Sequence, residues 1–194
     1  SEVSELARLG CEYVQLDAPH YPLLLDEKTR SFYQRQGLET EKWLRLGIEL
    51  DNGVIDSFPE LSFGIHLCRG NQGSRWLVSG SYEAIAEELF GSVHAARLLL
   101  EYDDERSGGF APLRFVPADK TVVLGLVTTK SPRLESVASL IGRIEEAAAY
   151  IDLDRLALSP QCGFSTSIVG NAISEECELA KLRVIAETAR EVWC

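Results

Sequence analysis

RLLLEYD (97–103) and VVLGLV (122–127) are two short runs that are apolar through most of their length. Runs of this kind are typical of strands in a parallel sheet that is covered on both faces. Three further runs have the same character: YVQLD (13–17), FGIHLC (63–68) and LALSPQC (156–162). The sequence therefore predicts five strands, and the intervals between them are long enough to hold helices.

Helical patterns fill these intervals. Apolar residues recur at helical spacing over residues 41–56 and 82–90. A further apolar stripe follows Ser131-Pro132, a pair that suits the first turn of a helix. A last helix is predicted to begin near Ser174. Strands that alternate with helices of this length build parallel βαβ units.

Two α/β folds fit this alternation, a doubly wound sheet and a (β/α)8 barrel. No G-x-G-x-x-G follows the first predicted strand, so the nucleotide-binding form of the doubly wound sheet is disfavoured. A barrel needs eight strands and typically about 250 residues. The chain has 194 residues, begins at Ser1 and contains no methionine, so we expect translation to begin upstream. We expect residues 1–194 to be the C-terminal five βα units of a single TIM-barrel catalytic domain, with no second domain.

Composition and charge exclude several classes of function. The chain carries 19 Lys+Arg against 30 Asp+Glu, a net charge of −11 that disfavours nucleic acid and anionic membranes as partners. No apolar run is long enough for a membrane span, and the first ten residues lack the layout of a signal peptide. The five cysteines are irregularly spaced, which favours metal binding or thiol chemistry over a disulfide framework. We therefore expect a cytoplasmic protein.

Candidate functional residues lie where the predicted strands end, because reactive groups in parallel α/β folds gather at the carboxyl ends of strands. In chain order these ends offer Asp17, His66, Cys68, Glu101, Thr128-Thr129-Lys130 and Cys162. His66 and Cys68 are two apart on one strand, so their side chains share a face.

Each of these residues also has an ordinary structural interpretation. His66 and Cys68 fit a packed histidine beside a buried cysteine, and Cys162 fits a small buried side chain. Glu101 follows three leucines, and a salt bridge to Arg106 would account for it. Considered together, one imidazole, two thiols and one carboxylate would converge in a closed barrel and form a tetrahedral site suited to Zn²⁺. The remaining cysteines, Cys11, Cys177 and Cys194, are expected to be structural.

Five motifs resemble those of the cobalamin-independent methionine synthase family, and most closely those of its short, single-barrel members. They are YVQLDAP (13–19), HLCRGN (66–71), LEYDDERSGGF (100–110), VVLGLVTTK (122–130) and SPQCGF (159–164), which follow one another in the family order. The resemblance implies a (β/α)8 barrel that uses zinc to transfer a methyl group from a methyltetrahydrofolate to the thiol of homocysteine, forming methionine. It also implies a set of zinc ligands: His66, Cys68, Glu101 and Cys162.

The resemblance further implies how substrates bind. Asp17 matches the acid that holds the amino group of homocysteine, although an aspartate that caps the turn before Pro19 would look the same. Arg69 and Asn71 are expected to contact substrate. The basic residues just past strand ends, Arg69, Arg75, Arg106 and Lys130, fit either an anionic donor or ordinary solvated loop cations.

The sequence departs from the family at one place. Folate-using members carry a histidine at the end of the penultimate strand, where this chain has Val127 and Thr128, neither of which can donate a proton near pH 7. His20, in DAPHYP, could replace it from another loop, although a loop histidine is usually only solvated. The methyl donor is therefore either a methyltetrahydrofolate or a donor whose leaving group needs no proton, such as a methylated corrinoid.

Two alternative functions stay open. One is zinc-dependent alkyl transfer to another small thiol, and the other is a non-catalytic barrel that zinc stabilises. Whatever the function, an open five-stranded fragment would expose a sheet edge and half of a barrel interior. We therefore expect an upstream segment or another chain to complete the barrel.

Overall fold

One sheet of five parallel strands organises the computed structural model, which describes residues 2–194. The strands are β1 (Tyr13–Asp17), β2 (Ser62–Leu67), β3 (Arg97–Glu101), β4 (Thr121–Val127) and β5 (Leu156–Pro160). Each corresponds to a predicted strand, so the five-strand prediction is confirmed.

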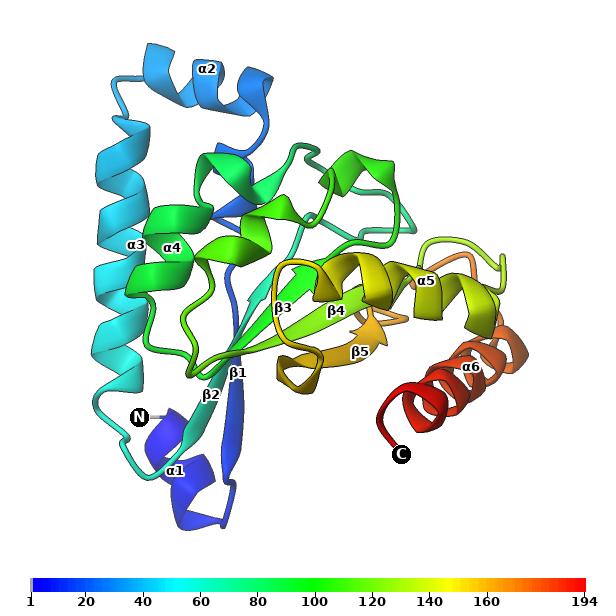
Figure 1. The fold of residues 1–194 in the computed structure, drawn as a ribbon. Helices are drawn as coiled ribbons and strands as arrows, with labels where there is room; N and C mark the ends of the chain where they lie inside the picture. The colour runs from blue at the N-terminus through cyan, green and yellow to red at the C-terminus, as the bar shows by residue number, and fades with distance from the viewer. Residues whose placement is uncertain (1) are drawn as a thin grey trace.

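The order of the strands distinguishes the two candidate folds. Each strand pairs with the next one along the chain, in the order β1-β2-β3-β4-β5. A doubly wound sheet reverses its direction at a switch point, whereas the crossovers of a barrel all advance the same way. Accordingly, the principal helices succeed one another along one side of the sheet (Figure 1). They are α3 (Thr40–Ile55), α4 (Ala86–Ser92), α5 (Val137–Ala148) and α6 (Glu175–Trp193). The fold is thus part of a (β/α)8 barrel.

Three details of the helices differ from the predictions. The sequence pattern missed α2 (Glu27–Arg35), a largely polar helix without an apolar stripe, which the Asp26 side chain caps by accepting from the backbone N–H of Thr29. The helix predicted over 82–90 is divided into a 3₁₀ turn (Tyr82–Ala84) and α4. α4 also extends two residues beyond the predicted range, to Ser92.

The start of α5 is the third difference. This helix begins after Ser136, whose hydroxyl accepts from the backbone N–H of Ser139, and not at Ser131-Pro132. Glu135 explains the delay, because its carboxylate accepts from the backbone N–H of Thr128 and from Lys181 Nζ. These long-range bonds hold the residues before Ser136 in a non-helical connection.

The two faces of the sheet have different chemistry. The face toward the helices is apolar and buried, with side chains such as Ile65, Leu98, Leu100 and Leu124. Because side chains alternate along a strand, their neighbours Gly64, His66, Leu99 and Glu101 point to the opposite face. This inner face would be the interior of a closed barrel, and it carries the polar groups.

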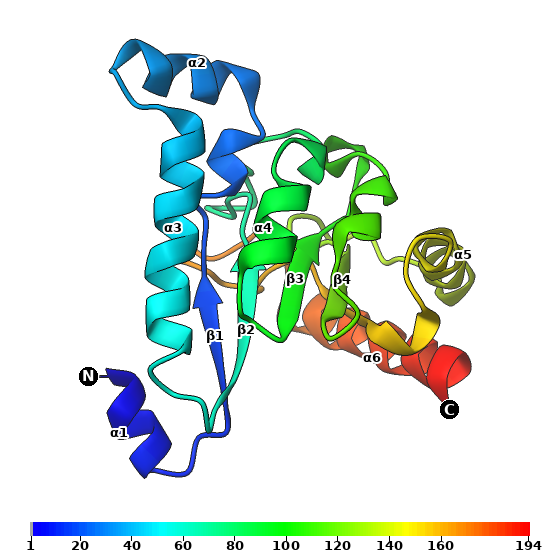
Figure 2. The same ribbon diagram turned by 60° about the vertical axis from the view of Figure 1, so that its left-hand side comes forward.

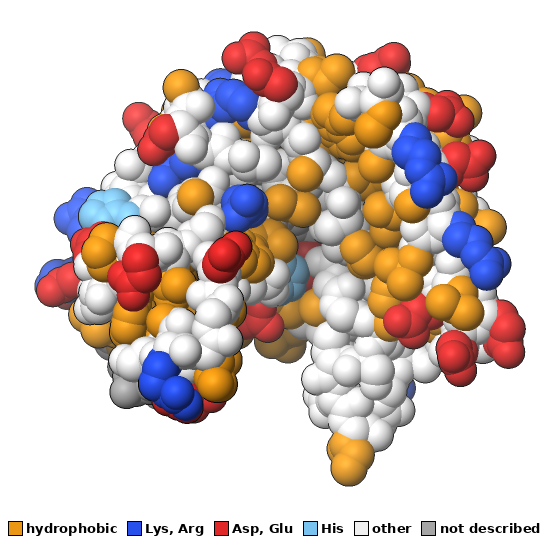
Figure 3. Space-filling view, turned by 90° about the horizontal axis from the view of Figure 1, so that it is seen from below, with side chains coloured by type: hydrophobic (Ala, Val, Ile, Leu, Met, Phe, Trp, Pro, Cys, Tyr) orange, Lys and Arg blue, Asp and Glu red, His pale blue; other side chains and the backbone are white. Residues whose placement is uncertain are grey.

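The sheet does not close within residues 2–194. Strands β1 and β5 each have a single neighbour in the described sheet and form its two edges. Figure 2 shows the edge strand β1 beside β2, at the end of the row of strands. Seen from below, the molecule is hollowed between two lobes (Figure 3). Among the described helices, none combines the length and the apolar character that crossing a bilayer requires.

Gly125 in β4 lies close to the backbone of β3 and to that of the segment at the end of β5. A Cβ atom at this position would be 2.8 Å from the Cα of Gln161 and 3.0 Å from the carbonyl oxygen of Leu100. The pairing of β4 with β5 also shifts register between Gly125 and Val127. A glycine here therefore lets the end of β5 cross close to β4, next to Cys162.

We predict that Gly125→Ala destabilises the full-length protein, because the added methyl group must push backbone atoms apart. Overpacking of this kind costs about 1–3 kcal/mol in the free energy of unfolding, which urea denaturation would measure. Gly142→Ala is the matched control, since Gly142 lies within α5 and a Cβ there meets no other atom within 4 Å. Equal urea midpoints for Gly125→Ala and the unmodified protein would contradict the prediction.

Candidate metal centre

Four potential metal ligands come from the carboxyl ends of three strands of the sheet. His66 is the penultimate residue of β2, and Cys68 directly follows that strand. Glu101 is the last residue of β3, and Cys162 follows β5. One donor atom from each residue lies within 4.8 Å of the donor atoms of the other three. The structure therefore brings together the four residues that the sequence singled out.

The separations between these donor atoms fit a tetrahedral ion. The sulfur atoms of Cys68 and Cys162 are 3.9 Å apart, and His66 Nε2 is 3.8 Å from Glu101 Oε1. A tetrahedral zinc with bonds of about 2.3 Å to sulfur separates two thiolates by roughly 3.8 Å. His66 Nε2 is buried and has no hydrogen-bond partner, which is rare for a buried polar atom. A metal ion would satisfy that nitrogen, so the residues fit zinc.

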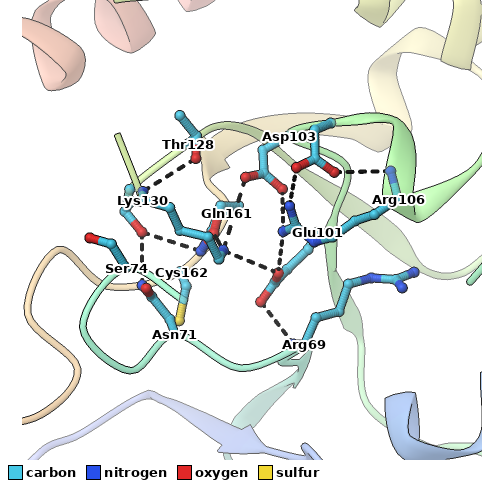
Figure 4. A network of polar contacts seen from close by, with 12 residues as sticks. Arg69, Asn71, Ser74, Glu101, Asp103, Arg106, Thr128, Lys130, Gln161 and Cys162 are labelled. Atoms are coloured by element: carbon cyan, nitrogen blue, oxygen red, sulfur yellow. Dashed lines mark hydrogen bonds and ion pairs between the residues drawn. The ribbon is translucent and has the colours of Figure 1, made fainter. Parts of the chain in front are cut away.

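Glu101 lies at the base of this cluster with no exposure to solvent. Its Oε1 accepts from the backbone N–H of Arg69 at 3.0 Å, and its Oε2 accepts from Arg106 Nη2 at 3.3 Å (Figure 4). The salt bridge to Arg106 and the place in the donor cluster are therefore both present. Burial raises the pKa of Glu101, and the nearby ammonium of Lys130 opposes that shift.

The two thiols differ in acidity, so that Cys162 is the one that more readily becomes a thiolate. The hydrogen bond with Cys68 lowers the pKa of Cys162 to about 4, against the effect of burial and with help from His66. The same contact raises the pKa of Cys68. Burial lowers the pKa of His66, but its contacts with Cys162 and Glu101 outweigh burial and raise it overall. The cluster is therefore built to stabilise negative charge on sulfur, as a metal ligand requires.

A cavity of about 470 Å³ lies against these donors, a size suited to a small molecule. His66, Cys162, Asp17 and Gln15 are among its lining residues. Asp17 pairs in register with His66 across β1 and β2, and its Oδ1 accepts from Gln15 Nε2 at 2.9 Å. The carboxylate of Asp17 therefore stands beside the donor cluster on the inner face.

Arg69 and Asn71 occupy the loop that follows β2. The Arg69 side chain is buried, stacks over the Tyr82 ring at 4.3 Å from its centroid and donates to the Gly80 carbonyl at 2.7 Å. Asn71 Nδ2 donates to Thr129 Oγ1 at 2.9 Å and to the Gly163 carbonyl at 3.0 Å. Arg69 thus holds the connection between β2 and α4 together, and Asn71 ties this connection to the loops after β4 and β5. A contact of either side chain with substrate stays a prediction.

The other cysteines and histidines lie apart from the cluster. Cys11 Sγ contacts the carbonyl of Tyr13 at the start of β1, and Cys177 Sγ contacts the carbonyl of Pro132. His20 Nε2 is 3.9 Å from an oxygen of Asp51 in α3, and His94 Nδ1 is 2.8 Å from an oxygen of Asp56. Of the three histidines, His66 is thus the one that the fold places in the cluster of potential metal ligands.

Two polar residues of the site escaped the sequence analysis. Gln15 lies two residues before Asp17, and the alternation of strand side chains would have placed both on one face. Gln161 is 1% exposed, accepts a hydrogen bond from Lys130 Nζ and donates to Thr129 Oγ1. Its position directly before Cys162 was the only available sign.

The chain is similar in sequence to a known family and to several known proteins. Residues 1–188 match the family model described as the catalytic domain of cobalamin-independent synthase. The uncharacterized proteins YxjG and YxjH of Bacillus subtilis (strain 168) are 44% and 41% identical over 95% of this chain and 49% of their own lengths. A methionine synthase of Pyrococcus horikoshii is 23% identical over 84% of this chain and 39% of its own length.

Two solved structures of methionine synthases resemble the fold of this chain. A putative vitamin-B12 independent methionine synthase from Listeria monocytogenes has a TM-score of 0.75 and 29% identity, covering 100% of this chain and 52% of its own. A B12-independent methionine synthase from Shewanella sp. W3-18-1, 18% identical with a TM-score of 0.74, shares the fold over 98% of this chain and 51% of its own. The chain thus spans about half the length of its curated relatives. The match over residues 1–188 shows that this chain belongs to the cobalamin-independent synthase catalytic domain family.

Proposed function

We propose that the chain is the zinc-binding part of a methyltransferase that forms methionine from homocysteine, with 5-methyltetrahydrofolate or a related compound as methyl donor. The observation that supports this proposal most is the cluster of four donor atoms, mutually within 4.8 Å, beside a cavity that Asp17 also lines. The family match and the distant relatives named methionine synthase agree with it.

His66, Cys68, Glu101 and Cys162 would hold the zinc ion. When bound, zinc would lower the pKa of a substrate thiol and orient its sulfur. Two thiolates and one carboxylate give the protein ligands a charge of −3, so the environment of a bound sulfur would stay rich in electrons. The protein thereby favours a nucleophilic thiolate.

Asp17 would bind the ammonium group of the acceptor amino acid. Its carboxylate lines the cavity next to His66, and Gln15 fixes its orientation through a 2.9 Å hydrogen bond. A carboxylate at this place favours a thiol that carries a positive charge, such as homocysteine, over a simple alkyl thiol. Alkyl transfer to a different small thiol is the alternative.

The methyl donor is left between two classes. Val127 and Thr128 end β4 and offer no proton donor, while His20 lies against Asp51 of α3. A methylated corrinoid, whose leaving group needs no proton, is therefore the alternative to methyltetrahydrofolate.

The two open edges of the sheet also support a barrel that is completed by a preceding segment or by another chain.

We predict that the full-length protein binds one zinc ion per chain. Cys162→Ser and His66→Ala should each lower the zinc affinity by more than about 100-fold, because losing even an outer-shell partner costs about 10–100-fold. Metal analysis and competition with a chelator would measure the loss. Cys177→Ser is the matched control and should keep full affinity, since Cys177 lies on α6 away from the cluster. An undiminished zinc affinity of Cys162→Ser would refute the proposed zinc centre.

We predict that added homocysteine changes the visible absorption of the cobalt-substituted protein. A thiol that reaches the metal alters its ligands, whereas a purely structural site would show no response. The spectrum therefore separates an enzyme from a non-catalytic, metal-stabilised barrel. Unchanged absorption at saturating homocysteine would favour the structural alternative.

Asp17→Asn should weaken homocysteine binding in this titration by roughly 10–100-fold, because hydrogen bonds to charged groups contribute about 1.5–3 kcal/mol. A thiol without an ammonium group is the internal control, and the substitution should leave its response unchanged. Equal homocysteine affinity in Asp17→Asn and the unmodified protein would remove Asp17 from the site.

Methyl transfer to homocysteine should then be assayed with methyltetrahydrofolate and with methylcobalamin as donors. Turnover with only one of them would identify the donor class. Turnover with neither, in a protein that binds zinc and responds to homocysteine, would count against methyl transfer from these two classes.

A further inference from the structure

The two oxygens of the Glu101 carboxylate face different partners. Oε1 lies on the side of the metal centre, 3.8 Å from His66 Nε2. Oε2 lies on the other side, 3.3 Å from Arg106 Nη2 and 3.8 Å from Lys130 Nζ (Figure 4). The buried carboxylate is therefore held in one orientation, with a single oxygen directed at the cluster.

Lys130 is the cation that connects this carboxylate to the next ligand. It follows β4, and its side chain is only 8% exposed, unlike that of a solvated loop lysine. Its ammonium donates to the side-chain oxygen of Gln161, the residue directly before Cys162. One ammonium group thus contacts a ligand at the end of β3 and the neighbour of a ligand after β5.

Arg106 cannot make this connection. Its guanidinium is also paired with Asp103 at 2.7 Å and with Asp104, both in the loop after β3. It therefore braces that loop, whereas Lys130 extends from β4 to both neighbouring strand ends. Burying a lysine is costly unless its charge is paired, and the Lys130 ammonium is paired with Glu101 Oε2 at 3.8 Å and with Asp103 Oδ2 at 4.0 Å.

We propose that Lys130 is a positioning residue of the metal centre, which holds Glu101 Oε2 and, through Gln161, the segment that carries Cys162. The proposal rests on the metal centre proposed above. It means that Glu101 offers one oxygen to the metal, so that the four protein ligands bind as four donor atoms. Without the ammonium, Oε2 would keep Arg106 Nη2 at 3.3 Å but lose its second cationic partner, so it would be held less firmly away from the metal. Outer-shell groups commonly orient ligands in this way.

The test uses cobalt-loaded full-length protein, because four-coordinate tetrahedral cobalt absorbs visible light more strongly than five-coordinate cobalt. We expect Lys130→Met to lose intensity in these bands and Lys130→Arg to restore it. Lys120→Met is the matched control: Lys120 directly precedes β4, is buried, and bonds to the carbonyls of Val93 and Ala95 at the opposite end of the sheet. It should keep the unmodified spectrum. Circular dichroism confirms folding, and Lys130→Gln replaces Lys130→Met should the latter not fold.

The outcomes separate this inference from the proposed function. A Lys130→Met spectrum identical to that of the unmodified protein would overturn the positioning role and leave the metal centre intact. Equal losses in Lys130→Met and Lys130→Arg would also overturn it, because they would indicate packing and not charge. Absence of cobalt binding in the unmodified protein would overturn the metal centre and this inference together.

Discussion

A carboxylate without access to water constrains the rest of this structure. Burying an unpaired charge costs several kcal/mol, so Glu101 must be surrounded by groups that stabilise it. The backbone N–H of Arg69 and the side chains of Arg106 and Lys130 do so within the protein. These partners come from the loops that follow β2, β3 and β4, so a polar network joins the carboxyl ends of these strands, while the helix-facing side of the sheet is apolar.

The structural and functional interpretations of single residues are compatible here. Glu101 makes the salt bridge to Arg106 that would explain it in any protein, and its other oxygen still faces His66. Cys68 and Cys162 are half-buried and also within 3.9 Å of each other. What distinguishes the site is that His66 Nε2, which is buried without a hydrogen-bond partner, belongs to a group of four potential metal ligands whose donor atoms lie within 4.8 Å of one another. A metal ion among these donors would satisfy that nitrogen.

The open sheet supplies the candidate metal centre but leaves its inner face uncovered. The inner face of five strands is open along β1 and β5, and the chain spans about half the length of its curated relatives. The donor cluster nonetheless lies wholly within this half, because all four ligands come from β2, β3 and β5. The candidate metal centre therefore depends on strand ends that the described residues supply, while the inner face stays open along β1 and β5.

The sequence by itself determined the five strands and placed the four potential ligands at strand ends. Apolar runs mark buried strands, and the alternation of side chains places His66 and Cys68 on one face whatever surrounds them. The start of α6 after Ser174 was likewise predictable, because helix capping is a local interaction. Tertiary structure alone decided the start of α5, the inward turn of Arg69 and the burial of Lys130. Each of these depends on partners that are remote in the sequence, such as Lys181 for Glu135 or Gln161 for Lys130, and no local pattern encodes such contacts.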